Sequence, residues 1–161
     1  MRELDKITAG GKISRVIDIS ASEGHVVPTA MVYHKGNFYV GNLDEFPATQ
    51  GTSKVWKITP SGQISVFAEG FTAVLGLAFD KEGQLYVLEA SAPVTNPGPP
   101  VIPGTGRVVR VTRSGGLQTV ASGLTFPTAM TFGPDEKLYI SNCGFGCPAG
   151  AGEIVRVNLD D

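Results

Sequence analysis

The stretch GLTFPTAMTFGPDEKLYISN, residues 123–142, decides the fold of this chain. Within it, residues 129–132 alternate between two directions, the turn residues Gly-Pro-Asp-Glu follow at 133–136, and residues 138–140 form a second strand-forming run. Two such runs on either side of a tight turn are typical of a β-hairpin. The stretch therefore predicts two antiparallel strands.

The hairpin pattern occurs three times along the chain. GFTAVLGLAFDKEGQLYVLE begins at Gly70 and keeps the register of the aromatic residues, and GHVVPTAMVYHKGNFYVGN begins at Gly24 with a turn one residue shorter. Further alternating strands follow the hairpins, at residues 55–59 and 64–67, 109–112 and 117–120, and 154–158. The chain also starts with strands of this second kind, at residues 5–8 and 13–16. The predicted order is therefore two strands, two complete units of four, and three final strands.

Length and composition favour one globular domain over residues 1–161. Hydrophobic residues make up 42% of the sequence and charged residues 17%, which excludes a disordered polyelectrolyte. The 21 glycines and 11 prolines predict frequent turns. A net charge of −2 provides no basic surface for nucleic acid, and no apolar run approaches the roughly 20 residues that span a bilayer.

Four-stranded units that recur about every 50 residues are typical of β-propeller blades. A single meander that is apolar on both faces cannot bury both unless a blade packs on either side of it. The sequence therefore predicts an all-β propeller with about three four-stranded blades. A sandwich or an open meander is the rival arrangement.

Closed propellers usually have about four to eight blades, so about three blades leave two blade faces uncovered. We expect two copies of the chain to join head to tail as a homodimer and complete a six-bladed ring, sharing their incomplete first and last blades. The alternative is that the chain is a fragment of a longer propeller. The amino-terminal segment MRELDKITAGGK lacks the apolar core of a secretory signal, which predicts a cytoplasmic chain, or an extracytoplasmic one whose leader has been removed.

The segment PTAMTFGPDEKLYISN, followed by GAGEIVRVNL, resembles the propeller proteins grouped as the ScyD/ScyE family, named for scytonemin pigment biosynthesis. More broadly, nearly the whole chain resembles the NHL and gluconolactonase-like six-bladed propellers. The resemblance implies the ring, and it brings no settled activity. Gluconolactonase-like enzymes hold a divalent metal through Glu, Asn and Asp, whereas the matching positions here are Thr29, Leu75 and Thr128. That metal site is therefore not carried over, and we predict neither a metal nor a cofactor.

The long connections, residues 41–53, 90–106 and 141–152, are expected on one face around the central channel, where propellers and other rigid scaffolds bind ligands. Polar side chains near this channel mouth are the candidate ligand-binding residues: Asn42, Asp44, Glu89, Asn142, His25, Thr29 and Thr128. They could converge on a polar ligand or a weak Ca²⁺ site, or they could cap strand ends. Residues 92–103, with five prolines, read as a stiff spacer or a recognition segment.

Cys143 and Cys147 share one glycine-rich loop. Their spacing allows a small disulfide or a pair of free thiols. A metal or redox role, or a nucleophile served by His25, remains the alternative, since zinc would need further ligands. A disulfide would indicate an oxidising compartment, in conflict with the missing leader. His34, in a tight turn on the opposite face, is expected to be solvated, and Trp56 is expected to pack between blades.

Long loops without a convincing catalytic set favour a non-catalytic scaffold that binds a protein or small molecule through the long-loop face. The alternative is a metal-dependent hydrolase or lactonase with Asn42, Glu89 and Asn142 as ligands. The sequence does not decide between an enzyme and a binding protein.

Overall fold

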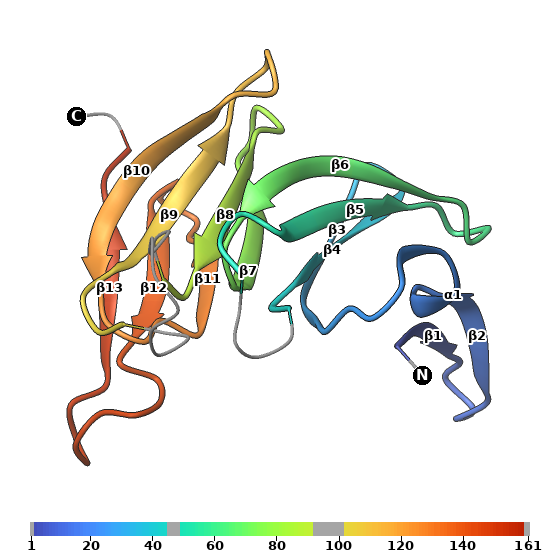
Figure 1. Ribbon diagram of the computed structural model, residues 1–161, viewed down its shortest axis with the longest axis horizontal. Coiled ribbons are helices and arrows are strands. Elements are labelled where there is room, and N and C mark those ends of the chain that lie inside the picture. Colours follow the sequence, from blue (N-terminus) through green and yellow to red (C-terminus); the bar gives the residue numbers. More distant parts are fainter. Residues whose placement is uncertain (1, 45–48, 92–101, 160–161) are drawn as a thin grey trace.

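The computed structural model describes residues 2–44, 49–91 and 102–159, and in these ranges the chain forms four antiparallel sheets (Figure 1). Sheet 1 contains β1 (Glu3–Ile7) and β2 (Ile13–Asp18), and sheet 2 contains β3 (Pro28–His34), β4 (Asn37–Asn42), β5 (Ser53–Ile58) and β6 (Ile64–Phe71). Sheet 3 contains β7 (Val74–Phe79), β8 (Leu85–Glu89), β9 (Gly106–Val111) and β10 (Leu117–Leu124), and sheet 4 contains β11 (Ala129–Phe132), β12 (Leu138–Asn142) and β13 (Glu153–Val157). The predicted order of two, four, four and three strands is confirmed.

Side-chain alternation explains how each strand divides between its two neighbours. On β3, Ala30 and Val32 pack toward sheet 3, while Met31 and Tyr33 point away from it and are exposed. His34 pairs with Asn37 across a two-residue turn in which Lys35 and Gly36 both have positive φ. Such a turn matches the right-handed twist of a hairpin. The turn thus sets the register in which β3 pairs with β4.

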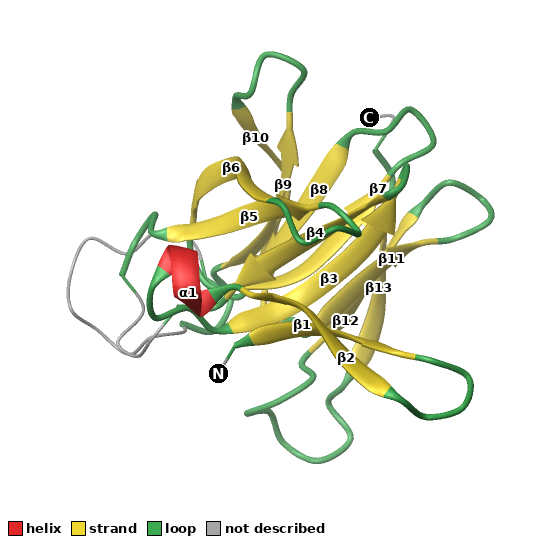
Figure 2. Cartoon of the chain, turned by 90° about the vertical axis from the view of Figure 1, so that its right-hand side faces the viewer, coloured by secondary structure: helices red, strands yellow, loops and turns green. Residues whose placement is uncertain are grey.

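The sheets follow one another in chain order, and β7 contacts both β3 and β11, so the first strands lie side by side (Figure 2). A hydrophobic core fills each gap between successive sheets. Between sheets 1 and 2 it includes Leu4, Ile19, Val26, Val40, Trp56 and Ile58. Between sheets 2 and 3 it includes Tyr39, Val55, Phe71, Val74, Leu77, Leu85, Val87, Val109 and Val111, and between sheets 3 and 4 it includes Ala78, Tyr86, Leu88, Val108, Leu124, Leu138 and Ile140.

The outer strands β6 and β10 are longer than the sequence pattern predicts. Register shifts interrupt the pairing of β5 with β6 and of β10 with β9, and the strands continue beyond them to Phe71 and Leu124. A bulge adds a residue to one strand and increases its local twist, so alternation breaks there while the strand goes on. Reading alternation alone therefore ends both strands too early.

The short helix α1 (Ser20–Glu23) follows β2 and was not predicted. Its Glu23 accepts a hydrogen bond from Nε1 of Trp56 at 2.8 Å, and Trp56 is buried in the core between sheets 1 and 2. The expected packing role of Trp56 is therefore confirmed. No helix among the described residues has the length and apolar character needed to cross a bilayer.

His34 does not behave as a solvated turn residue. Its ring stacks on that of Phe79 in the next sheet, with centroids 4.0 Å apart and planes 11° from parallel. Burial lowers the pKa of His34 below its ordinary value. The expectation of a solvated histidine was wrong because the contact comes from a strand 45 residues further along the chain, which the local sequence around the turn does not reveal.

Candidate functional site

Asn42, Glu89 and Asn142 occupy equivalent positions, at the ends of β4, β8 and β12, and all three are buried. Oε1 of Glu89 accepts a hydrogen bond from the backbone N–H of Thr72 at 2.5 Å. Oδ1 of Asn142 accepts one from the equivalent N–H of Thr125 at 2.8 Å. Glu89 and Asn142 thus each join the end of the second strand to the segment that leads into the same sheet, and we call these two contacts strand-end latches.

The Glu89 latch is also an ion pair. Nε of Arg107 on β9 donates to Oε2 of Glu89, whose side chain is completely buried, while that of Arg107 is 21% exposed. Burial raises the pKa of Glu89, and the hydrogen bonds from Arg107 and Thr72 oppose that rise. The carboxylate is therefore held by one donor on the neighbouring strand and by one in the segment that leads into its sheet.

In sheet 2 the strand-end residue takes different partners. Oδ1 of Asn42 accepts the backbone N–H of Lys54 at 2.7 Å, and its amide nitrogen donates to Asp44. Asp44 also accepts hydrogen bonds from Thr52 and, at 3.1 Å, from Oγ of Ser53. The structure thus brings Asn42 and Asp44 together and uses both to fix the two ends of the connection between β4 and β5.

The remaining predicted ligand residues are placed separately. Oγ1 of Thr29 donates to the carbonyl oxygen of Val74 at 2.5 Å and so joins the first strands of sheets 2 and 3. Oγ1 of Thr128 donates to Oγ of Ser141 at 3.2 Å inside sheet 4, and His25 is exposed after α1. The described residues contain no group of three or more His, Cys, Asp or Glu side chains that could hold a metal ion.

A disulfide joins Cys143 and Cys147 in the connection that follows β12, with Cα atoms 5.7 Å apart. The loop presents Phe145, which is 44% exposed and whose ring centroid lies 5.0 Å from that of Phe126. A Cβ on Gly146 would lie 3.2 Å from the Phe126 ring, so this glycine permits the close approach. Of the proline-rich segment, residues 92–101 lie outside the described residues.

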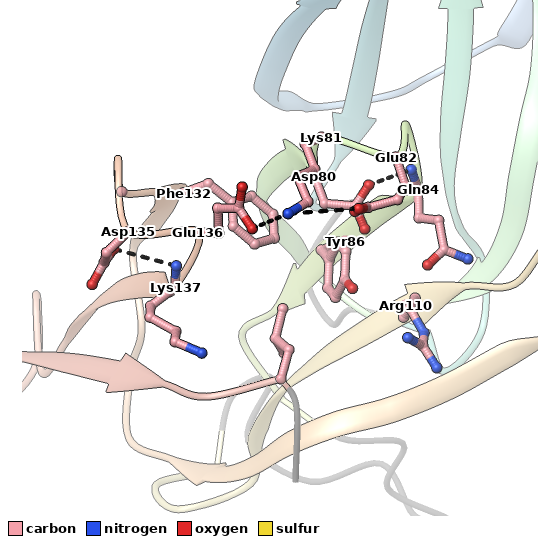
Figure 3. Close-up of a pocket in the computed structure, with 12 residues that line it drawn as sticks. Asp80, Lys81, Glu82, Gln84, Tyr86, Arg110, Phe132, Asp135, Glu136 and Lys137 are labelled. Carbon is pink, nitrogen blue, oxygen red and sulfur yellow. Dashed lines mark hydrogen bonds and ion pairs between the residues drawn. The ribbon is translucent and has the colours of Figure 1, made fainter.

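A groove of about 410 Å³ lies between the short turns of sheets 3 and 4 (Figure 3). Lys81 reaches across it to Glu136 and lies 3.9 Å from Glu82. Tyr86 lines the groove, and burial raises its pKa. Sequence reasoning missed this groove because it looked for ligand-binding residues among the long connections, and the groove lies between two short turns. The available signal was the charge in both turns, Asp-Lys-Glu-Gly at 80–83 and Pro-Asp-Glu-Lys at 134–137.

No protein-family model matches the sequence, and the search of curated proteins found no match. Solved structures do match. They include a protein of unknown function from Bacteroides thetaiotaomicron (TM-score 0.64, 15% identity, 86% of this chain and 39% of the other) and a proposed gluconolactonase (0.62, 15%, 98% and 56%). A luciferin-regenerating enzyme gives a TM-score of 0.59 at 12% identity, covering 88% of this chain and 49% of the other. The fold of these neighbours is a propeller. The chain is a partial β-propeller.

This propeller spans 39% to 56% of the length of those three structures. Its similarity to these three proteins concerns the fold, at identities of 12% to 15%. In Figure 1 the connection between β12 and β13 lies at the lower end of the view and the turns after β7 and β9 at the upper end. The propeller therefore has a long-loop face, which carries the disulfide, and a short-turn face, which carries the groove.

Proposed function

We propose that this propeller is a non-catalytic scaffold that binds a protein or a small molecule through its long-loop face. The observation that carries the proposal is the use of the strand-end side chains. Glu89 and Asn142 each accept a backbone N–H at the base of a connection, at 2.5 and 2.8 Å. Binding loops need fixed ends on a rigid support, and these latches supply them.

The disulfide loop is the part of that face that we propose to contact the partner. Phe145 is 44% exposed and rests against Phe126, so an aromatic pair faces solvent on a covalently closed loop. An ordered aromatic side chain loses little conformational freedom on binding. We also place the chain, as part of this proposal, with the ScyD/ScyE-type propellers, on the motif PTAMTFGPDEKLYISN.

A metal-dependent hydrolase would need Asn42, Glu89 and Asn142 to turn oxygen atoms toward one cation. Their oxygens instead accept hydrogen bonds from Lys54 in the same sheet and from Thr72 and Thr125 in the segments that lead into sheets 3 and 4. Each of these oxygens has already used one lone pair on an N–H. Turning the side chain toward a cation would leave that N–H without its acceptor, at a cost of about 1–3 kcal/mol each. This cost favours the scaffold over the hydrolase.

Calorimetric titration with Ca²⁺, Mg²⁺ and Zn²⁺ separates the two functions. We expect no stoichiometric heat from the wild-type chain. Tight binding of one ion per chain that disappears in Glu89→Gln would contradict the scaffold and restore the hydrolase. Glu89→Gln keeps an oxygen acceptor for the N–H of Thr72. Circular dichroism of the same samples verifies that the variant is folded.

Selection of peptides from a random phage-displayed library tests the binding face itself. We expect the selected peptides to lose binding to Phe145→Ser and to keep it with Lys81→Ser, which alters only the short-turn face. The opposite pattern would move the binding site to the groove of Figure 3 and would contradict the proposal.

A further inference from the structure

The two internal interfaces between sheets repeat the same contacts. Tyr39 of sheet 2 meets Phe79 of sheet 3 with ring centroids 4.7 Å apart, and Tyr86 of sheet 3 meets Phe132 of sheet 4 at 5.2 Å. In each case a tyrosine on the second strand of one sheet contacts an aromatic residue on the first strand of the next. The repeat thus specifies an interface as well as a fold.

Sheet 2 presents the receiving half of this interface to a neighbour that the chain does not supply. Tyr33 occupies on β3 the position that Phe79 holds on β7, and Met31 occupies the position of Leu77. Leu77 is 7% exposed, whereas Met31 is 57% and Tyr33 is 61% exposed. We call Met31 and Tyr33 the leading face.

Sheet 4 presents the complementary half. Tyr139 on β12 matches Tyr39 and Tyr86, and Thr131 on β11 matches Ala78, which is 5% exposed. Thr131 and its neighbour Ala129 are exposed. We call Ala129, Thr131 and Tyr139 the trailing face. Sheets 4 and 1 lie at opposite sides of the molecule, so one copy cannot join its own two faces (Figure 1).

We propose that the leading face binds the trailing face of a second copy of this chain, and that two copies joined twice in this way close into one ring. Tyr33 then meets Tyr139 of the second copy as Phe79 meets Tyr39, and Met31 packs on its Ala129. The occupant is a second copy because the two faces match the two sides of the internal interface. The leading face corresponds to the side of sheet 3 that packs on sheet 2, and the trailing face corresponds to the side of sheet 2 that packs on sheet 3. This inference does not depend on the proposed ligand-binding function.

The space for the second copy lies beside β3. Sheet 1 supplies only strands of the third and fourth kinds, so it covers the outer part of sheet 2 and leaves an apolar groove of about 230 Å³ next to β3. Met31, Ala30, Val40, Leu4 and Ile19 line it. Inside the chain, β7 lies beside β3 and β11 lies beside β7. The first strand of a second copy's sheet 4 continues that series in the groove.

When the ring closes, sheet 4 of one copy and sheet 1 of the other together form one shared sheet. This sheet then has one strand too many. β1 and β13 are both third strands, and only one of them can pair with β12 there. The contacts proposed above involve β3, β11 and β12 alone. They are therefore the same whichever third strand leaves the sheet.

Light scattering on the 161-residue chain tests the ring. We expect twice the chain mass of 16.9 kDa at micromolar concentration. Tyr33→Asp and Thr131→Lys should each raise the dissociation constant about 30-fold or more, because each buries an unpaired charge at both interfaces. Leu117→Asp is the control, since Leu117 is exposed on β10 of an internal sheet and belongs to neither face. It should leave the mass unchanged.

Mixing the two interface variants gives the decisive measurement. A dimer of one Tyr33→Asp chain and one Thr131→Lys chain has one unaltered interface and one interface in which the two introduced charges are opposite in sign and attract each other. We therefore expect dimer to return in the mixture at concentrations where each variant alone is monomeric, which also shows that both variants are folded. A folded monomer for the wild-type chain, an open assembly larger than two, or a mixture that stays monomeric would each overturn the proposal.

Discussion

Glu89 on β8 lies opposite Arg107 on β9, and their side chains form an ion pair in which the carboxylate is completely buried. The same carboxylate accepts the N–H of Thr72, so one side chain joins β8, β9 and the segment that leads into β7. Removing one partner from such a pair leaves an uncompensated charge in the interior, which is costly. Sheet 3 therefore depends on this pair.

Arg107→Ala should lower the free energy of unfolding by about 3 kcal/mol at pH 7. Burial raises the pKa of Glu89 above its ordinary value of 4.5, so the folded protein takes up this proton at a higher pH than the unfolded chain does. The carboxyl group therefore contributes most stability below pH 4.5, and the contribution falls as the pH rises through the folded pKa. Only the charged form of Glu89 suffers from the absence of Arg107. The reduction in the free energy of unfolding caused by Arg107→Ala should therefore be smaller at pH 5 than at pH 7. Urea denaturation at both values measures it, and an equal loss at both would contradict this account.

Asn142→Ala should cost about 1–3 kcal/mol, because the N–H of Thr125 loses its acceptor. Asn37→Ala is the matched control, since its amide donates only within an exposed turn. We expect a change of less than about 0.5 kcal/mol there. Equal effects in the two variants, measured by urea denaturation, would show that the strand-end latch contributes nothing.

Gly41→Ala should destabilise the chain by about 1–3 kcal/mol through overpacking. A Cβ at this position would lie 2.6 Å from Cγ1 of Val74, a buried residue of the next sheet. Combining it with Val74→Ala should give a smaller loss than the sum of the two single losses, because the clash is removed. Gly10→Ala, where the nearest side-chain atom is 3.9 Å away, is the control. Additive losses in the double variant would contradict the close contact.

Replacing Cys143 and Cys147 together by serine should lower the free energy of unfolding by about 2 kcal/mol, the chain-entropy value for a loop closed by so short a separation. Denaturation with and without a reductant measures the effect. The reductant should reproduce the loss in the wild-type chain and leave the double serine variant unchanged. A reductant that has no effect on the wild-type chain would contradict the bond.

The repeat made most of the fold predictable from sequence. Phe79 and Phe132 recur in register, and the structure places them at equivalent interfaces, which is why strand order and the stacking of sheets could be inferred. The lengths of β6 and β10 could not, because bulges break the alternation on which strand prediction depends.

The site was less accessible to sequence reasoning. Asn42, Glu89 and Asn142 were recognised as strand-end residues, and capping was one of the alternatives. Which role applies depends on backbone N–H groups such as that of Thr72, which side-chain patterns do not report. The stacking of His34 on Phe79 and the bridge from Lys81 to Glu136 escaped prediction for a related reason: both join turns or strands of different sheets.

The agreement between the two internal interfaces has a consequence for how such a chain can be lengthened. Sheet 3 contacts sheet 4 through Tyr86, as sheet 2 contacts sheet 3 through Tyr39. On its other side, sheet 3 meets Tyr39 through Phe79, as sheet 4 meets Tyr86 through Phe132. A tandem duplicate of residues 70–122 would therefore find compatible neighbours on both of its sides without any compensating substitution. Growth of the gene by whole units is in this sense already permitted by the protein, and a single longer polypeptide built from these parts would have no need of a second molecule.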